Sequence, residues 1–325
     1  MQLEVIGGSC LGIDVGKADF HCALLIDGRS RSNSFSNSQA GFQKLLGWLH
    51  NRDAWRVHAC LESTGGWSEE LAGFLYKHDH GVSVVNPSAV KAFGQSELSR
   101  TKADKADAAL IARYCQAMAP RLWTPPSPSQ QRLQRLSRRR VALDGMRVQE
   151  SNRLKGPGVD DVRSSIEETI AFLTRQIKAI DAEIAALIDD DPSLRSKREL
   201  LESIPGIGER VATTILGELP QITELGNGKA LAAFVGLCPR EYRSGTSVGT
   251  SWLSKVGNRN VRRVLYMPAM TAMRFNPVLR AFAARLRSYG KRPKQIIAAV
   301  MRRLIVIAYG VLKSAQPFSA QGGHC

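Results

Sequence analysis

Apolar and polar positions recur with clear periods through the first third of the chain, and these periods predict its elements. Apolar runs predict strands at 10–15 and 19–26, joined by a turn at 16–17, and residues 32–36 are compatible with a third strand. Alternating helices and strands are then expected at 41–49 (helix), 57–61 (strand), 67–77 (helix), 82–85 (strand) and 103–117 (helix). Three strands in a meander followed by alternating helix and strand are typical of an α/β domain with a mixed sheet.

The pattern changes at residues 123–129, where three prolines interrupt it and indicate a boundary. Two long polar helices follow, at 133–154 and 166–188. In the second helix, apolar residues alternate three and four apart, at 166, 170, 173, 177, 180, 184 and 187. This heptad spacing predicts a coiled-coil arm that offers its seam to another chain, and an amphipathic helix packed on its own domain is the alternative.

The remainder of the chain has the pattern of a basic, mostly α-helical domain. It contains one Gly/Ser-rich irregular stretch, at 236–257, and ends with an amphipathic helix at 294–312. Residues after Pro317 resemble a loose tail. We therefore expect an α/β domain at 1–124, a helical arm at 125–192, a C-terminal domain at 193–318 and a tail at 319–325.

Composition excludes several classes of protein. The 325 residues are 43% hydrophobic, which is enough for packed cores and excludes a disordered chain. The sequence has no uninterrupted apolar run of about 18 residues, so no membrane-spanning helix is expected, and its start does not resemble a secretory signal. The six cysteines form no CxxC pair and have no zinc-ligand spacing, which predicts reduced thiols in a cytoplasmic protein.

The positive charge is concentrated in two segments. The formal net charge is +16, and residues 241–313 contain 15 Lys and Arg against one acid, while residues 121–155 contain nine against two. Such segments attract phosphate backbones or anionic membranes. They lack the Trp- and Phe-rich face of an interfacial helix, so nucleic acid is the favoured partner and a membrane is not expected. A solubilising surface is the remaining alternative.

Four carboxylates occupy positions suited to metal binding. Asp14 lies in the first predicted strand and Glu62 ends another, while Asp104 and Asp107 are three apart on one helix face. An acid in an apolar strand is costly unless it is paired or binds a metal. Together the four could hold one or two Mg²⁺ ions, which clamp the attacking and leaving oxygens of a phosphodiester. Each acid alone has a simpler explanation, such as an ion pair with a neighbouring lysine, but the ordered set indicates a ribonuclease-H-like nuclease core.

Two further motifs lie in the basic half of the chain. Residues 201–210 resemble a helix-hairpin-helix, in which the Gly206 and Gly208 turn presents backbone N–H groups to a phosphate; an ordinary helix–helix corner is the alternative. In the polar loop 242–249, Arg243 stands beside Ser244 and could hold a phosphate near its hydroxyl. Tyr242 is a rival nucleophile, and metal activation could replace the missing histidine base.

These motifs, in this order, resemble the DEDD insertion-sequence transposases, the bridge-RNA-guided recombinases related to Piv-type DNA invertases. The resemblance extends over residues 10–318 and rests on motifs beginning at Gly12, Cys60, Asn86, Lys102, Ile204, Tyr242 and Leu265. It implies a RuvC-like N-terminal domain in which Asp14, Glu62, Asp104 and Asp107 form an acidic Mg²⁺ tetrad. It also implies a C-terminal transposase domain whose Ser244 attacks DNA and forms a 5′-phosphoserine intermediate.

The resemblance implies partners as well. Donor and target DNA would be selected by a structured non-coding bridge RNA, and the active site would combine domains from different protomers of a tetramer built from dimers. Nucleic-acid contacts are expected from the following residues: Arg243, Lys255, Arg259, Arg262, Arg263, Gly206 and Gly208. DNA as a substrate implies a nucleoid-associated location in the cytoplasm.

Two other functions stay open at this point. A water-using RuvC-like nuclease or resolvase would need the acidic tetrad but not Ser244. A non-catalytic nucleic-acid-binding protein would keep the basic segments and tolerate loss of both.

Overall fold

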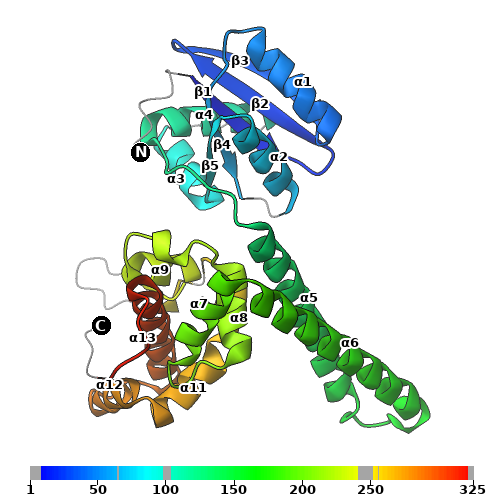
Figure 1. Cartoon of the computed structure of the whole chain (residues 1–325), viewed down its shortest axis with the longest axis vertical. Coiled ribbons are helices and arrows are strands. Elements are labelled where there is room, and N and C mark those ends of the chain that lie inside the picture. Colours follow the sequence, from blue (N-terminus) through cyan, green and yellow to red (C-terminus); the bar gives the residue numbers. More distant parts are fainter. Residues whose placement is uncertain (1–8, 64–65, 98–103, 241–251, 255, 321–325) are drawn as a thin grey trace. The chain divides into compact units, whose positions relative to one another are not determined.

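The computed structural model describes residues 9–63, 66–97, 104–240, 252–254 and 256–320, apart from the side chains of Asp104 and Lys105. The chain divides into two compact units, residues 1–125 and residues 126–325 (Figure 1). The first is an α/β unit and the second is almost entirely helical.

The first unit is built on a five-stranded mixed sheet in the order β3-β2-β1-β4-β5. Its strands are β1 (Cys10–Val15), β2 (Asp19–Ile26), β3 (Arg29–Ser36), β4 (His58–Glu62) and β5 (Gly81–Val85). The first three form an antiparallel meander, and β4 and β5 run parallel to β1. The mixed sheet predicted from the sequence is therefore confirmed.

Helices cover both faces of this sheet. They are α1 (Gln39–His50), α2 (Gly66–Lys77), α3 (Pro87–Ser96) and α4 (Asp104–Met118). One buried cluster joins Leu11 and Ile13 of β1 to Phe42 of α1, and a second joins Cys10 of β1 to Ala108 of α4. Because alternate residues of a strand point to opposite faces, β1 contributes to both cores.

Helix α3 was not predicted from the sequence. Its first residue is a proline, and the preceding Asn86 caps it by accepting a hydrogen bond from the Ser88 N–H at 2.8 Å. The Asn86-Pro87 pair follows the end of β5 and begins α3 directly, because asparagine caps a helix and proline is favoured in its first turn. The sequence pattern showed only the end of the strand.

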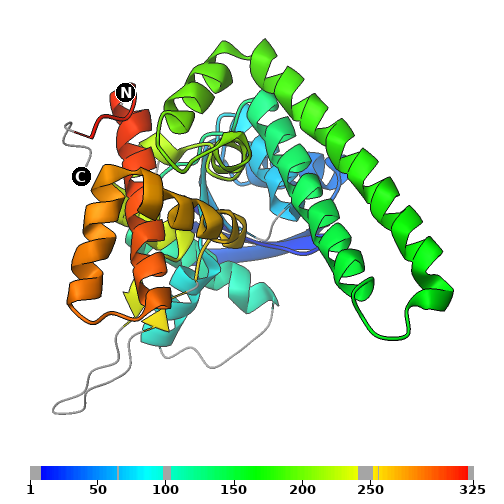
Figure 2. The ribbon, with the colours of Figure 1, turned by 90° about the horizontal axis from the view of Figure 1, so that it is seen from below.

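The second unit begins with two long helices that lie side by side, α5 (Pro128–Arg153) and α6 (Arg163–Asp190), in both views of the chain (Figures 1 and 2). Leu143 of α5 and Leu173 and Ile177 of α6 form one buried cluster. Nearer the rest of the unit, Ile184 and Ile188 join its main core. The expectation that the α6 seam has no partner within the chain is therefore wrong, because α5 and the adjoining core cover it.

The second unit contains further helices, two short strands and two 3₁₀ turns. They are α7 (Pro192–Glu202), α8 (Glu209–Glu218), α9 (Gly228–Val235), α10 (Arg259–Val264), α11 (Tyr266–Phe275), α12 (Pro277–Ser288), α13 (Pro293–Ser314), the strands β6 (Pro239–Arg240) and β7 (Trp252–Leu253), and two 3₁₀ turns, η1 (Asp160–Val162) and η2 (Ile222–Glu224). Helix α13 contacts α7, α9, α11 and α12.

Helix α13 is also the one helix among the described residues that is long and apolar enough to cross a membrane. Its most apolar 18-residue window has a mean hydropathy of 1.7, and 56% of that window is buried inside the protein. The sequence-based exclusion of any spanning-type helix was therefore too broad. Burial explains the composition, because a helix surrounded by other helices is apolar over most of its circumference.

Candidate functional site

Two of the candidate acids end neighbouring parallel strands. Strands β1 and β4 pair in a register that sets Ile13 opposite Leu61, so the residues that follow, Asp14 and Glu62, reach the same edge of the sheet. Both residues are half-buried. Neighbouring residues of a parallel pair point to the same face, which brings the two carboxylates close together.

Gly12 brings the third acid to this edge. A Cβ atom at Gly12 would lie 2.2 Å from the Ala108 carbonyl oxygen and 2.2 Å from the Ala112 nitrogen of α4. The missing side chain thus allows the backbone of α4 to rest directly on β1. Asp107, which directly precedes Ala108, is held at the strand ends that carry Asp14 and Glu62.

The electrostatics of Glu62 report this proximity. Burial raises the pKa of Glu62, and the nearby carboxylates of Asp14 and then Asp107 raise it further. A cluster of half-buried carboxylates that repel one another has the donor chemistry of a hard divalent cation site. The Asp104 carboxylate lies outside the described residues, and those that are described include no preformed group of three or more metal-ligating side chains.

Solvent reaches this edge through a small pocket. The pocket has a volume of about 280 Å³ and is formed by the turn between β1 and β2, with Asp14, Lys17, Asp19 and His21 among its lining residues. Lys17 provides the one positive charge in this lining. Asp14 is therefore accessible to a ligand from outside the sheet.

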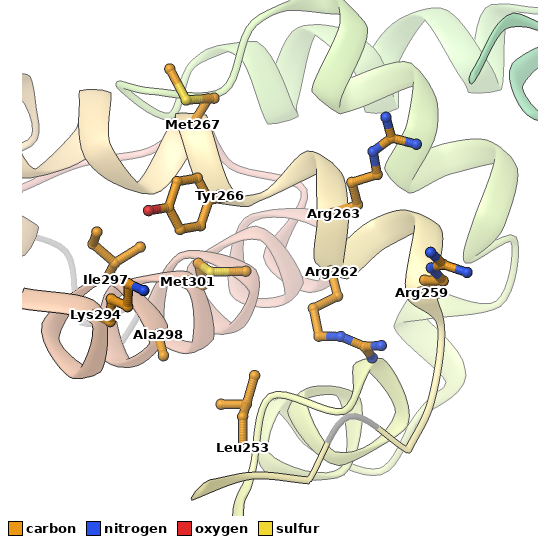
Figure 3. Close-up of a pocket in the computed structure, with 10 residues that line it drawn as sticks. All are labelled: Leu253, Arg259, Arg262, Arg263, Tyr266, Met267, Lys294, Ile297, Ala298 and Met301. Atoms are coloured by element: carbon orange, nitrogen blue, oxygen red, sulfur yellow. The ribbon is translucent and has the colours of Figure 1, made fainter. Parts of the chain in front are cut away.

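The nucleic-acid-binding residues expected on α10 lie together in the second unit. Arg259, Arg262 and Arg263 line a groove of about 630 Å³ with Lys294 of α13 (Figure 3). Arg243, Ser244 and Lys255, together with the rival Tyr242, lie outside the described residues. Strands β6 and β7 pair with each other on either side of residues 241–251, the segment that contains Ser244. Leu253 of β7 lines the same groove.

The two glycines of the predicted helix-hairpin-helix differ in their surroundings. Gly206 has φ +107°, and a Cβ there would lie 2.7 Å from the Ala272 Cβ and 3.0 Å from the Pro268 carbonyl oxygen of α11. Packing and backbone conformation therefore require glycine at 206, as at an ordinary helix–helix corner. Gly208 is exposed and is the N-cap residue of α8, and no side chain among the described residues caps the backbone N–H groups of the first turn of that helix.

Glu218 is a structurally central residue that the sequence reasoning missed. Its buried carboxylate accepts hydrogen bonds from Arg138 of α5 and from the side-chain amides of Asn258 and Asn260 at 2.9 and 2.7 Å. Burial alone would raise the pKa of Glu218, but these hydrogen bonds outweigh it and lower the pKa. Glu218 therefore fixes the start of the cationic helix α10 against α5 and α8. The only signal in the sequence is an acid at the end of an apolar helix, which is weak.

Comparisons with known proteins match both units. The profile of IS110-type DEDD transposases matches residues 11–156, and the profile described as the transposase IS116/IS110/IS902 family matches residues 198–284. The pilin gene-inverting proteins of Moraxella bovis and Moraxella lacunata are each 33% identical over 312 residues, which cover 95% of this chain and 97% of theirs. The transposase for insertion sequence element IS1328 of Yersinia enterocolitica is 25% identical and covers 81% of this chain and 83% of its own.

Proposed function

Because the chain belongs to the IS116/IS110/IS902 family of DNA transposases and invertases, we propose that it is an RNA-guided recombinase that cuts and rejoins DNA through a serine nucleophile. The mixed sheet of its first unit fits the ribonuclease-H-like domain of DEDD transposases. The observation that supports the proposal most is that Asp14 and Glu62 end neighbouring strands of that domain and that Asp14 and Asp107 lie near enough to raise the pKa of Glu62 beyond the effect of its burial.

The acids of the first unit would hold one or two Mg²⁺ ions. Carboxylates at the ends of β1 and β4 and on α4 would provide the ligands, with Asp104 as the fourth. When bound, the ions would neutralise charge on the scissile phosphate and favour the deprotonated form of the attacking hydroxyl. The mutual repulsion that raises the pKa of Glu62 supports this assignment, because a cation would relieve it.

Ser244 would supply the nucleophile. Its Oγ attacks the scissile phosphorus, the bond from phosphorus to the 3′ oxygen breaks, and the products are a 3′-hydroxyl and a 5′-phosphoserine ester. The ester conserves the phosphodiester bond energy, so a new 3′-hydroxyl can reseal the strand without ATP. Arg243 would hold a phosphate oxygen beside the hydroxyl.

A structured bridge RNA would select donor and target DNA, and the protein would act as a tetramer of two dimers in the cytoplasm, at the nucleoid. The excess of cations in the second unit supports binding of both DNA and RNA. In this assembly the acids of one protomer and the serine of another would form each active site.

Two sets of variants test the proposed chemistry. Asp14→Asn, Glu62→Gln, Asp104→Asn and Asp107→Asn should each abolish strand cleavage in Mg²⁺ while the protein stays folded by circular dichroism. Ser244→Ala should remove both recombination and a denaturant-resistant adduct between protein and the DNA 5′ phosphate, and Tyr242→Phe should leave the adduct in place. Peptide mapping of the phosphate to Tyr242, or full cleavage by any two acid variants, would refute the assignment.

The same experiment separates the alternative functions. If Ser244→Ala still hydrolyses DNA at the normal rate, the protein is a water-using nuclease. If the native protein, Ser244→Ala and Asp14→Asn all bind nucleic acid equally and none of them cleaves a strand, the protein is a non-catalytic nucleic-acid-binding protein.

A further inference from the structure

The groove between α10, α11 and α13 has two chemically different walls (Figure 3). The three arginines of α10 form one wall: Arg259, Arg262 and Arg263. The other side is mainly apolar and carries Lys294 of α13 among Leu253, Tyr266, Met267, Ile297, Ala298 and Met301. The volume of about 630 Å³ falls within the roughly 300–1,000 Å³ typical of small-molecule sites, and a single nucleotide is a ligand of that size.

Among the described residues, no acid neutralises the cations of the groove. Within the described part of the chain none of the four forms an ion pair, and no acid lines the groove. Arg262 is partly committed, since its Nη1 donates a hydrogen bond to the Val235 carbonyl oxygen at 2.9 Å. Burial lowers the pKa of Arg262, and the charge of the neighbouring Arg259 lowers it further. Such a field favours an anion with more than one oxygen, such as a phosphate.

A phosphate alone would make no favourable contact with the apolar side of the groove, so a ligand that fits the groove has an apolar part as well. Tyr266 is 43% exposed and Met267 is 64% exposed at the start of α11, next to the arginines of α10. The Tyr266 ring lies on the same side of the groove as Ile297 and Lys294 of α13 (Figure 3). Exposed aromatic and thioether groups beside cations match a nucleobase and its phosphate, because every base has a flat π-face that stacks on an aromatic ring.

We propose that this groove binds one unpaired nucleotide of a nucleic-acid strand, with the base against Tyr266 and Met267 and the flanking phosphates on Arg259, Arg263 and Lys294. A base within a duplex is covered by its neighbours, so the nucleotide must be single-stranded or extruded. Leu253 of β7 lines the groove, and β7 follows directly in sequence after the segment that contains Ser244. The proposal rests on the proposed function only for the class of ligand and does not require Ser244 to be the nucleophile.

Photo-crosslinking and binding with the full-length chain test the proposal. The probes are short single-stranded DNA and RNA oligonucleotides that contain one 5-iodouracil, and a fully paired duplex of the same sequence. We expect crosslinks to Tyr266 or Met267 with a single strand, and weaker crosslinking with the duplex. The DNA and RNA arms then show which strand occupies the groove.

Three variants at exposed tyrosines separate stacking from general effects. Tyr266→Ala should weaken single-strand binding by about 5- to 100-fold, the usual effect of removing one stacking platform, and Tyr266→Phe should bind as the native protein does. Tyr289→Ala is the matched control, since Tyr289 follows α12, is 71% exposed and lies outside the groove. Replacing Arg263 and Lys294 together by Gln should make the salt dependence shallower, by about 0.7 in slope for each single-strand phosphate that is no longer neutralised.

Two results would overturn the proposal: crosslinks that map outside the groove, or a Tyr266→Ala variant that binds single strands with native affinity. If that variant also changes the sedimenting mass, the groove is an interface between protein chains. Because all readouts are binding measurements, they can be repeated in Ser244→Ala. Failure of the serine chemistry would leave the crosslinks intact, and absence of the crosslinks would leave the serine assignment untouched.

Discussion

The charged form of the Glu62 carboxylate destabilises the fold. Its pKa is raised by burial and by Asp14 and Asp107, so the folded protein holds a proton there more tightly than the unfolded chain does. A raised pKa contributes stability that is present below the ordinary value of 4.5 and is lost as the pH rises through the folded-state pKa. At neutral pH the charged carboxylate is therefore destabilising unless a cation is bound.

We predict that Glu62→Gln melts at a higher temperature than the native protein in EDTA at neutral pH, by a few degrees, and that Mg²⁺ stabilises it less. Glu70→Gln, at an exposed carboxylate of α2, is the control and should change neither property. Differential scanning fluorimetry with and without Mg²⁺ measures both. A variant that melts lower in EDTA, or that gains as much from Mg²⁺ as the native protein, would contradict a cation site at these carboxylates.

His80 gives the first unit a pH dependence of its own. The ring is 4% exposed, its Nδ1 accepts a hydrogen bond from the Val57 N–H at 3.3 Å, and burial foremost, then the charges of His78 and His50, lower the pKa of His80 to about 4. The unfolded chain takes up a proton near pH 6.5 and the folded protein does not until about pH 4, so stability is complete above 6.5 and declines as the pH falls through that window.

We predict that the first unit loses about 2 kcal/mol of unfolding free energy through His80 between about pH 7 and about pH 5. His80→Asn keeps an acceptor for the Val57 N–H and cannot take up a proton, so its stability should fall less over the same range. Urea denaturation at both pH values gives the difference between the two proteins. Parallel pH profiles would show that the ring is not responsible.

Residue types and spacing were enough to predict acids that lie near one edge of the sheet. They were not enough to find residues whose importance comes from the packing of elements that are distant in sequence. Asp14 and Glu62 end predicted strands, and Asp107 follows Asp104 at helical spacing, so their positions are local properties of the sequence. Glu218 matters because three helices meet at it, and Tyr266 because α11 packs beside α13. No local pattern encodes such meetings.

Among the elements, the contact of α4 with β1 depends on one glycine. We predict that Gly12→Ala costs at least about 3 kcal/mol, because the added Cβ meets helix backbone and not a movable side chain. Gly73→Ala is the matched control, because a Cβ at this glycine of α2 would meet open space. The Gly73→Ala protein should be slightly more stable than the native protein, since alanine favours a helix. Denaturant melts of the two variants measure the contrast. A native-like Gly12→Ala protein would mean that α4 does not rest on β1 in solution.

The α6 helix allows an even closer comparison. Leu173 is buried against α5, and its neighbour Phe172 is 50% exposed. We predict that Leu173→Glu destabilises the packing of the two helices by about 2–4 kcal/mol, whereas Phe172→Glu stays within about 0.5 kcal/mol of the native protein. Proteolysis in the connection between α5 and α6 and urea unfolding report the effect. Equal effects of the two substitutions would place the seam elsewhere on the helix.

Periodicity located most of the elements, and its errors have physical causes. The strands at 10–15 and 19–26 agree with β1 and β2 to the residue, because alternation and turn residues are local signals. The third strand begins earlier than predicted, at Arg29, because Asp27 and Gly28 both adopt positive φ in a tight hairpin turn. The partner of the α6 seam was missed because the polar sequence of α5 conceals the apolar stripe that includes Leu133 and Leu143.

At the scale of the whole molecule, binding to nucleic acid should be dominated by charge. The 15 cations of residues 241–313 predict a logarithmic salt slope that steepens by about 0.9 for each duplex phosphate neutralised. Filter binding or fluorescence anisotropy over a salt series measures this slope. Affinity that is unchanged between low and moderate salt would contradict an electrostatic footprint, and sequence-specific recombination without any RNA would contradict guidance by RNA.

The two units differ in charge, and in the proposed function this difference would limit the cutting of DNA that the protein has not captured. Residues 1–125 hold 13 Lys and Arg against 12 Asp and Glu, whereas residues 126–325 hold 32 against 17. The acidic cluster repels the phosphates on which it would act, so the first unit has little means of capturing a strand alone. In the proposed function, linkage to the cationic unit would instead raise the effective concentration of captured DNA around the acids. Free DNA would then be a poor substrate, and cleavage would be reserved for strands that the second unit has already captured.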